Sequence, residues 1–117
     1  MRYSLDMSQH ELLRSHVRSV YAYQQPNKDH GENDIFLELM DGRIYSFLAA
    51  TPQFMAAYMA RENSREFVSP GLLVVDSLEA ESILNALEAC VRTSQQGLPL
   101  DHYGVLQEAL GAGAGIE

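Results

Sequence analysis

Two apolar segments, residues 34–40 and 43–49, lie on either side of the pair Asp41-Gly42. A tight turn between strands needs backbone angles with positive φ, which glycine and aspartate adopt more readily than most residues. Asp-Gly between two apolar segments therefore predicts a β-hairpin over residues 34–49. The two segments would form neighbouring antiparallel strands.

The length of the turn decides which side chains share a face of the hairpin. With a two-residue turn, Leu39 pairs with Ile44 and Phe36 pairs with Phe47, and opposed side chains point to the same side. One face would then be a plain apolar core face, made of Ile35, Leu37, Leu39, Ile44 and Leu48. The other face would combine aromatic and charged side chains, namely Phe36, Glu38, Met40, Arg43, Tyr45 and Phe47.

The segments before the hairpin predict a helix and a strand. Ser8 and Glu11 have the spacing of a capping box, so we expect a short helix over residues 8–16. Residues 17–24 are rich in β-branched and aromatic side chains, which favours a strand. A polar loop at residues 26–33 would connect this strand to the hairpin.

The segments after the hairpin alternate between helix and strand. Thr51 and Pro52 suit the N-cap and the first helical position, and apolar side chains recur at helical spacing to about residue 63. Residues 67–68 and 71–75 predict a strand interrupted by Ser69-Pro70, and the unbroken apolar run at residues 72–75 indicates burial on both faces. A long amphipathic helix is expected within residues 76–97, and a last short helix at residues 101–110.

Together these elements predict one α+β domain over residues 1–110, in the order α-β-β-β-α-β-α-α. Three strands would form an antiparallel meander, and a helical crossover would lead to the fourth strand of a mainly antiparallel sheet. Helices would pack against this sheet. Residues 111–117 are mostly glycine and alanine, and we expect them to form a flexible tail.

Charge limits the classes of partner. The 117 residues include 16 acidic and 8 basic side chains, which gives a formal net charge of −8. Nucleic acids and anionic membranes attract basic surfaces, so neither is an expected partner. A protein with a basic surface is compatible with this charge, because opposite charges speed the encounter of two proteins.

Cysteine usage and hydropathy indicate the compartment. Cys90 is the single cysteine, so there is no internal disulfide, and this suits a reducing cytoplasm. Residues 1–6 contain no apolar run of the kind found in signal peptides. No segment is long and apolar enough to suggest a membrane span. We therefore expect a cytoplasmic protein.

The sequence contains no recognisable catalytic, cofactor or metal motif. Cys90 falls on the apolar face of the long predicted helix, where a buried thiol is a poor nucleophile. His10 and His16 are six residues apart and would not share one helix face, and the loop at residues 29–34 lacks the ligand spacing of an EF-hand. We expect no enzyme activity, although the sequence leaves open a catalytic set assembled from distant residues.

The mixed face of the hairpin is the candidate partner-binding surface. Aromatic and arginine side chains are enriched at the centres of protein interfaces. The candidate residues are Glu32, Asp34, Phe36, Glu38, Arg43, Tyr45 and Phe47. If residues 17–24 pair alongside, Tyr21 and Tyr23 would join this face. The alternative is that the N-terminal helix covers the face.

Acidic side chains are concentrated in two segments. Residues 29–41 hold five carboxylates and no lysine or arginine, and residues 76–88 hold four carboxylates. In its size, its acidity, the hairpin at residues 34–49 and the strand-to-helix segment at residues 67–91, the chain resembles small bacterial immunity proteins of contact-dependent and polymorphic toxin systems. The resemblance implies a non-catalytic inhibitor that neutralises a basic cognate toxin in the cytoplasm. The alternative interpretation is a small homodimeric module that binds a ligand or supports assembly.

Overall fold

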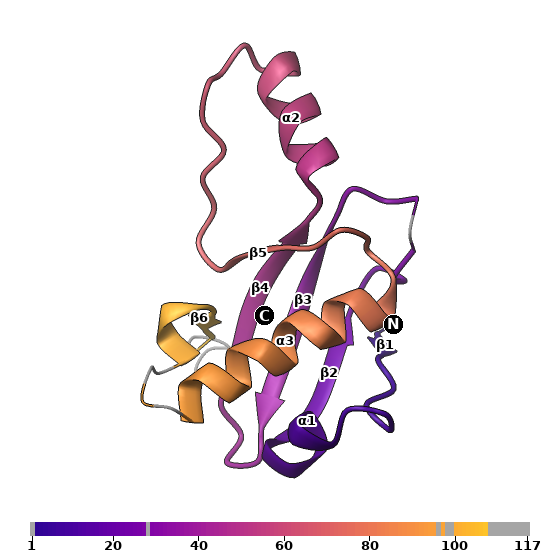
Figure 1. Ribbon diagram of the computed structural model, residues 1–117, viewed down its shortest axis with the longest axis vertical. Helices are drawn as coiled ribbons and strands as arrows, with labels where there is room; N and C mark the ends of the chain where they lie inside the picture. The colour runs from indigo at the N-terminus through magenta and orange to yellow at the C-terminus, as the bar shows by residue number, and fades with distance from the viewer. Residues whose placement is uncertain (1, 28, 96, 98–99, 108–117) are drawn as a thin grey trace.

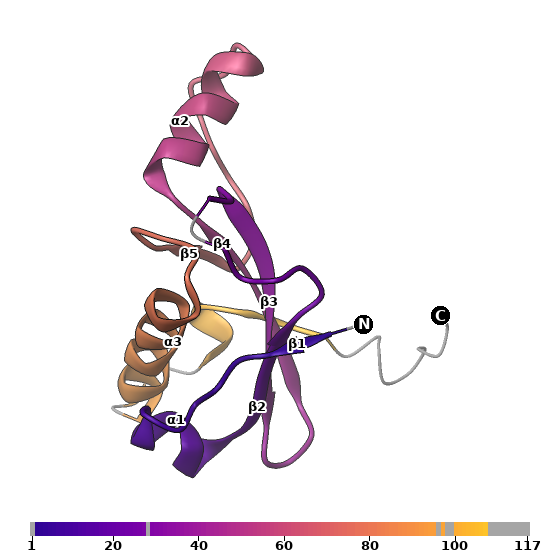
Figure 2. The ribbon, with the colours of Figure 1, turned by 90° about the vertical axis from the view of Figure 1, so that its right-hand side faces the viewer.

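A single sheet forms the centre of the molecule, and the computed structural model describes residues 2–27, 29–95, 97 and 100–107 of the chain (Figure 1). The strands are β1 (Tyr3–Ser4), β2 (Val17–Ala22), β3 (Glu32–Leu39), β4 (Ile44–Ala50), β5 (Leu72–Val74) and β6 (Val105–Leu106). The helices are α1 (Glu11–His16), α2 (Pro52–Arg61) and α3 (Ala80–Gln95), with one 3-10 turn, η1 (Leu100–His102). Helices α1 and α3 lie on one face of the sheet (Figure 2).

The order of the strands confirms the predicted α+β fold. Strands β1, β2, β3 and β4 are joined in sequence order as antiparallel neighbours. Helix α2 crosses to β5, which pairs with β4 in parallel. Strand β6 pairs antiparallel with another part of the same edge of β4. The meander and the helical crossover are therefore confirmed, and β1 and β6 are additional strands.

The last predicted helix is wrong over the part that the structure describes. Residues 100–106 form η1 and β6 instead, and residues 108–110 lie outside the described residues, as does the predicted tail at 111–117. Gly104 passes so close to the ring of Phe47 that a Cβ atom there would lie 2.6 Å from Phe47 Cζ. Beyond it, the Gln107 amide donates to the Ile44 carbonyl at 2.8 Å. Pairing with β4 thus overrides a weak local helix pattern.

The hairpin forms where it was predicted, but its turn is one residue longer. The Leu39 amide donates to the Arg43 carbonyl at 2.8 Å, and the Gly42 amide donates to the Leu39 carbonyl at 3.0 Å. Three residues therefore form the loop, with Gly42 at a φ of 95°. This is the three-residue hairpin loop in which glycine takes the left-handed position.

The longer turn changes the register, and the predicted pairing is wrong. Phe36 lies opposite Ser46, and Ile35 lies opposite Phe47. A shift of one residue moves every side chain of a strand to the other face. Consequently Tyr45 and Phe47 enter the core, while Ile44 and Leu48 join the opposite face. The face compositions derived from a two-residue turn are corrected accordingly.

The core lies between the sheet and the helices on its covered face. The apolar stripe of α3 is buried there, as its spacing predicted, with Ile83, Leu84, Leu87, Cys90 and Val91. Leu13 of α1 and Phe47 of β4 complete this layer. Strand β5 is buried on one face only, because Leu73 is buried while Val74 is 52% exposed. The prediction of burial on both faces is therefore wrong, and so is the predicted strand at residues 67–68, which lie outside β5.

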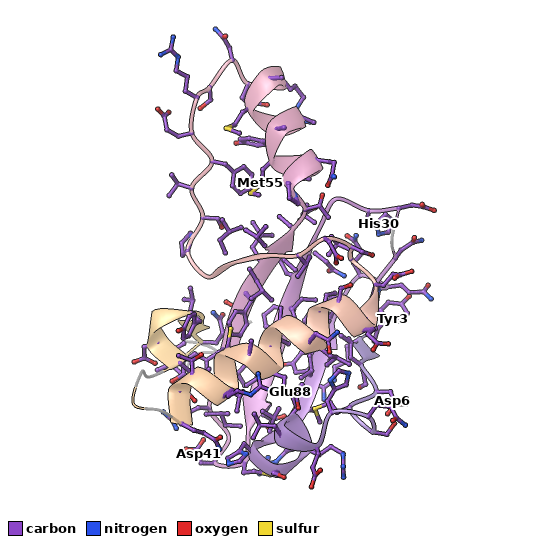
Figure 3. All side chains as sticks on the ribbon, in the orientation of Figure 1. Tyr3, Asp6, His30, Asp41, Met55 and Glu88 are labelled. Carbon is purple, nitrogen blue, oxygen red and sulfur yellow. The ribbon has the colours of Figure 1, made fainter. Side chains whose placement is uncertain are left out.

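The N-terminus of α1 is capped from another helix. Ser8 does not cap it, since the helix begins at Glu11 and the Ser8 amide donates to Asp6 Oδ1. Instead Glu88 of α3, which is labelled in Figure 3, accepts the Leu12 amide at 3.1 Å. Its other oxygen lies 3.3 Å from His10 Nδ1. The predicted capping box is therefore wrong. A carboxylate distant in sequence accepts from a first-turn amide that has no partner within the helix.

Helix α2 begins as its sequence predicted but packs differently from α1 and α3. Thr51 Oγ1 accepts the Phe54 amide at 3.1 Å, and Pro52 occupies the first turn. None of the ten residues of α2 is buried. The helix stands away from the sheet, beyond the ends of β3 and β4 (Figure 1, Figure 2).

Candidate functional site

The second face of the sheet carries no helix in the part of the chain that the structure describes (Figure 2). Its side chains come from alternate positions of the strands, as the register dictates. They are mostly half-buried or exposed: Tyr21, Tyr23, Asp34, Phe36, Glu38, Ile44, Ser46, Leu48, Leu72, Val74 and Val105. Because no helix of the described residues covers this face, we call it the open face.

Three aromatic rings cluster on the open face. Tyr21 lies opposite Phe36 in the β2–β3 pairing, and their rings stack with centroids 5.4 Å apart. Tyr23 meets both rings edge-on, at 5.8 Å from Tyr21 and 5.5 Å from Phe36. The guanidinium of Arg2 covers the ring of Tyr21 at 3.9 Å, so Tyr21 is buried while Tyr23 is 61% exposed. Both tyrosines join this face, as the sequence indicated.

A shallow depression borders this cluster where β2 ends and β3 begins. Its walls are Tyr23, Gln24, Glu32, Asn33, Asp34 and Phe36. Asn33 is buried and its side-chain amide donates to the Gln24 carbonyl at 2.9 Å, which fixes the two strands that form the walls. Two carboxylates and two aromatic rings thus surround the depression, and we call it the β2–β3 depression.

The structure separates the candidate residues named from the sequence. It brings Glu32, Asp34 and Phe36 together at the β2–β3 depression. Glu38 lies farther along the open face and is held by Arg18, with Nη1 and Oε2 3.2 Å apart. The sequence analysis did not include Gln24, whose part in the depression depends on the pairing of β2 with β3.

Three other candidates lie outside the open face. Tyr45 and Phe47 are 2% and 1% exposed on the covered side of the sheet, so they are wrong as surface contacts. Arg43 lies at the hairpin turn, where its Nε atom is 2.9 Å from Asp41 Oδ2. The cause is the three-residue loop, which turns the side chains of β4 over relative to those of β3.

A larger cavity, of about 460 Å³, lies on the other side of the sheet between the hairpin turn, the end of α3 and η1. The Tyr45 hydroxyl donates to Asp101 Oδ1 at 2.6 Å, and Arg43 Nη1 lies 3.4 Å from the Tyr45 oxygen. Burial, with Asp101 adding to it, raises the pKa of Tyr45 above its usual value. A neutral phenol that already donates to a carboxylate ties η1 to β4, which is a structural role.

The buried thiol of Cys90 has the same inert character. It lies on the core side of α3, and burial raises its pKa to about 11 from a usual value of 9.0.

Among the residues that the structure describes, no group of three or more histidine, cysteine, aspartate or glutamate side chains could hold a metal ion. Within the same residues, no helix has the length and apolar character needed to cross a bilayer.

Cys90 should react slowly with a thiol reagent. At pH 8 a rise of the pKa from 9.0 to about 11 lowers the thiolate fraction by about a hundredfold, before shielding by the core is counted. We expect the native protein to react with an aromatic disulfide at least a hundredfold more slowly than the urea-unfolded protein at this pH. Equal rates would contradict the burial of this thiol.

The same pKa shift gives stability a pH dependence. The folded-state value lies above the unfolded one, so the thiol contributes its full stabilisation below about pH 9. This contribution is lost as the pH rises towards 11, because the unfolded thiol ionises first.

No family model matches the chain, and searches of curated proteins and of solved structures found no significant match. The geometry of the molecule offers an exposed aromatic and acidic surface on one face of the sheet and a structural hydrogen-bond network on the other.

Proposed function

We propose that this chain is a non-catalytic protein-binding domain that takes a partner with a basic surface at the β2–β3 depression. The observation that supports the proposal is the position of Glu32 and Asp34 beside the rings of Tyr23 and Phe36 on the open face. The function that we propose for this domain is that of an immunity or inhibitor protein, which neutralises a basic toxin in the cytoplasm.

The chemistry of the depression suits an arginine or lysine side chain of such a partner. A carboxylate attracts the charged group, and a guanidinium can form two parallel hydrogen bonds with it. The face of an aromatic ring adds a cation–π contact worth about 0.5–2 kcal/mol. Arg2 above Tyr21, at 3.9 Å, is an internal example of a guanidinium on a ring of this same face.

The charge of the whole chain favours the approach of the same class of partner. A net charge of −8 attracts a basic protein from a distance, and oriented attraction raises association rates. The attraction is screened by salt, since the Debye length is about 8 Å at physiological ionic strength. Binding of the proposed partner should therefore weaken as salt is added.

Charge reversal at the depression tests the proposal with a short arginine-rich peptide as the probe. Asp34→Lys should weaken binding of the peptide by about tenfold at low salt, because it removes an attraction and adds a repulsion. Glu81→Lys changes the net charge by the same amount on α3, and should leave the affinity within about twofold. Both side chains are exposed, so neither change disturbs the core. Binding would be measured by fluorescence anisotropy.

An equal loss of peptide affinity in the two variants would show that only net charge matters and would contradict the depression as the site.

The immunity function has its own test. A gene next to this one should encode a secreted protein with a basic C-terminal toxic domain, and co-expression of this chain should restore growth. Wild-type rescue lost in Asp34→Lys would support the function, and no rescue by the wild type would contradict it.

A further inference from the structure

The segment between β4 and β5 projects from the body of the molecule. It consists of α2 and the chain that returns to β5, residues 52–71, and we call it the α2 arm. Figures 1 and 2 show the arm standing beyond the end of the sheet, and Figure 3 shows Met55 on it, away from the core. Helix α2 has no charged residue before Arg61 and no buried residue. A helix that is apolar on several sides is usually buried.

The returning chain covers only one side of α2. Phe67 meets Phe54 and Tyr58 edge-on, with ring centroids 6.0 and 5.3 Å away. Outside this small cluster, Ala57 is exposed and Val68 is 87% exposed. Apolar side chains of the arm are therefore left in contact with solvent, and Tyr58 of the cluster is itself 37% exposed.

The direction of the arm is fixed at its base. The Thr51 amide donates to the Gly31 carbonyl at 3.1 Å. Phe54 packs against Gly31 so closely that a Cβ atom there would lie 2.6 Å from Phe54 Cδ1. These contacts hold the first turn of α2 and set the direction in which the helix leaves the sheet.

We propose that the α2 arm is the contact surface of a homodimer, in which the arms of two copies pack against each other. Charge favours a second copy over a basic protein as the occupant. Within the arm, Arg61 and Arg65 balance Glu62 and Glu66, so the arm is neutral and the net charge of −8 resides in the rest of the chain. The arm itself adds no electrostatic attraction for a basic partner, which the acidic rest of the chain attracts instead.

The geometry also keeps the two acidic bodies apart. The ten residues of α2 extend over about 15 Å at 1.5 Å per residue. That distance is about two Debye lengths at physiological salt, so repulsion between the bodies is largely screened. Contact through the arms is the arrangement in which two copies of this acidic chain meet with little electrostatic cost.

A standard interface uses about 20–30 residues from each partner and buries about 800 Å² of each. The arm comprises residues 52–71, some of which pack on one another, so a contact through the arms lies at or below the small end of this range. A twofold axis would place the same apolar surface of each copy against the other. The residues that line the β2–β3 depression lie outside the arm, so a dimer would carry two such depressions.

Sedimentation equilibrium of the full chain tests the proposal. At 1–100 µM in 0.15 M salt, we expect a mass approaching twice the 13.1 kDa of the chain. Ala57→Glu introduces a charge on the exposed side of α2 and should weaken the dimer at least tenfold. Ala89→Glu makes the same exchange at an exposed position of α3 on the body, and should leave the dimer unchanged. Circular dichroism would confirm that both variants fold.

Salt separates this proposal from the proposed function. Dimerisation through neutral arms should not weaken as salt is added to 0.15 M and above, whereas binding of a basic partner should weaken. A wild-type chain that is monomeric at 100 µM would overturn the dimer. An equal effect of the two alanine substitutions would overturn the arm as its contact. Either result leaves the test of the β2–β3 depression unaffected.

Discussion

Phe47→Ala is expected to lower the free energy of unfolding by about 3–5 kcal/mol, the usual cost of removing a fully buried aromatic side chain. Phe47 is 1% exposed, and its ring lies between the helices and the sheet with Gly104 against its end. The neighbouring chain cannot easily close the space, because Gly104 has no side chain to move into it. Urea denaturation followed by circular dichroism would measure the change.

Leu48→Ala is the matched control, one residue along the same strand. Leu48 lies on the open face and is half-buried, so we expect it to cost less than about 1.5 kcal/mol. A two-residue turn would put Leu48 in the core and Phe47 on the other face, and the two costs would then be in the opposite order. The pair of variants thus measures the register of the hairpin as well as its stability.

Glu88→Ala should cost about 1–3 kcal/mol, because it leaves polar groups without their partner. Glu88 accepts the Leu12 amide at 3.1 Å and lies 3.3 Å from His10 Nδ1, and its side chain is only 17% exposed. Its loss would free the N-terminus of α1 from α3. Thermal unfolding of the variant would report the loss as a lower midpoint.

Ser8→Ala is the control for this second prediction. A capping box at Ser8 would make its removal cost about 1 kcal/mol, whereas in the structure the Ser8 side chain is exposed and caps no helix. We expect a change of less than about 0.5 kcal/mol. A larger loss at Ser8 than at Glu88 would contradict the cap supplied by α3.

The elements that the sequence predicted correctly are those set by local signals. Thr51 and Pro52 mark the start of α2, and the signal lies within residues 51–54. The apolar spacing of α3 already indicates its buried face. Asp41-Gly42 located the hairpin. It did not set the register, because glycine with positive φ suits both a two-residue turn and a three-residue loop. The one additional residue in the loop therefore decides which face of the sheet carries Tyr45 and Phe47.

The features that could not be predicted depend on partners far along the chain. Glu88 caps a helix that begins 77 residues earlier, at Glu11. Strand β6 has only two residues, so its backbone is held by β4 rather than by any local preference. In the same way, the acidic loop indicated Glu32 and Asp34, but the place of Tyr23 beside them follows from strand pairing.

The exposure of α2 illustrates a further limit of sequence patterns. Its apolar spacing correctly predicted a helix, and helix packing in the core was the simplest interpretation of that spacing. The structure shows instead that the close contact between Phe54 and Gly31 directs the helix away from the body. Periodicity reports that a surface is apolar, but it contains no information on what that surface contacts.

The arrangement of strands has a consequence for the behaviour of the protein at high concentration. The long strands β3 and β4, of eight and seven residues, both lie inside the sheet. In the part of the chain that the structure describes, β1, β5 and β6 lie at its borders with two or three residues each, and β1 pairs with two of the six residues of β2. Short border strands offer few free backbone groups for adding a foreign strand, which is how proteins avoid fibrillar aggregation. The two longest strands are thus shielded on both sides from such pairing.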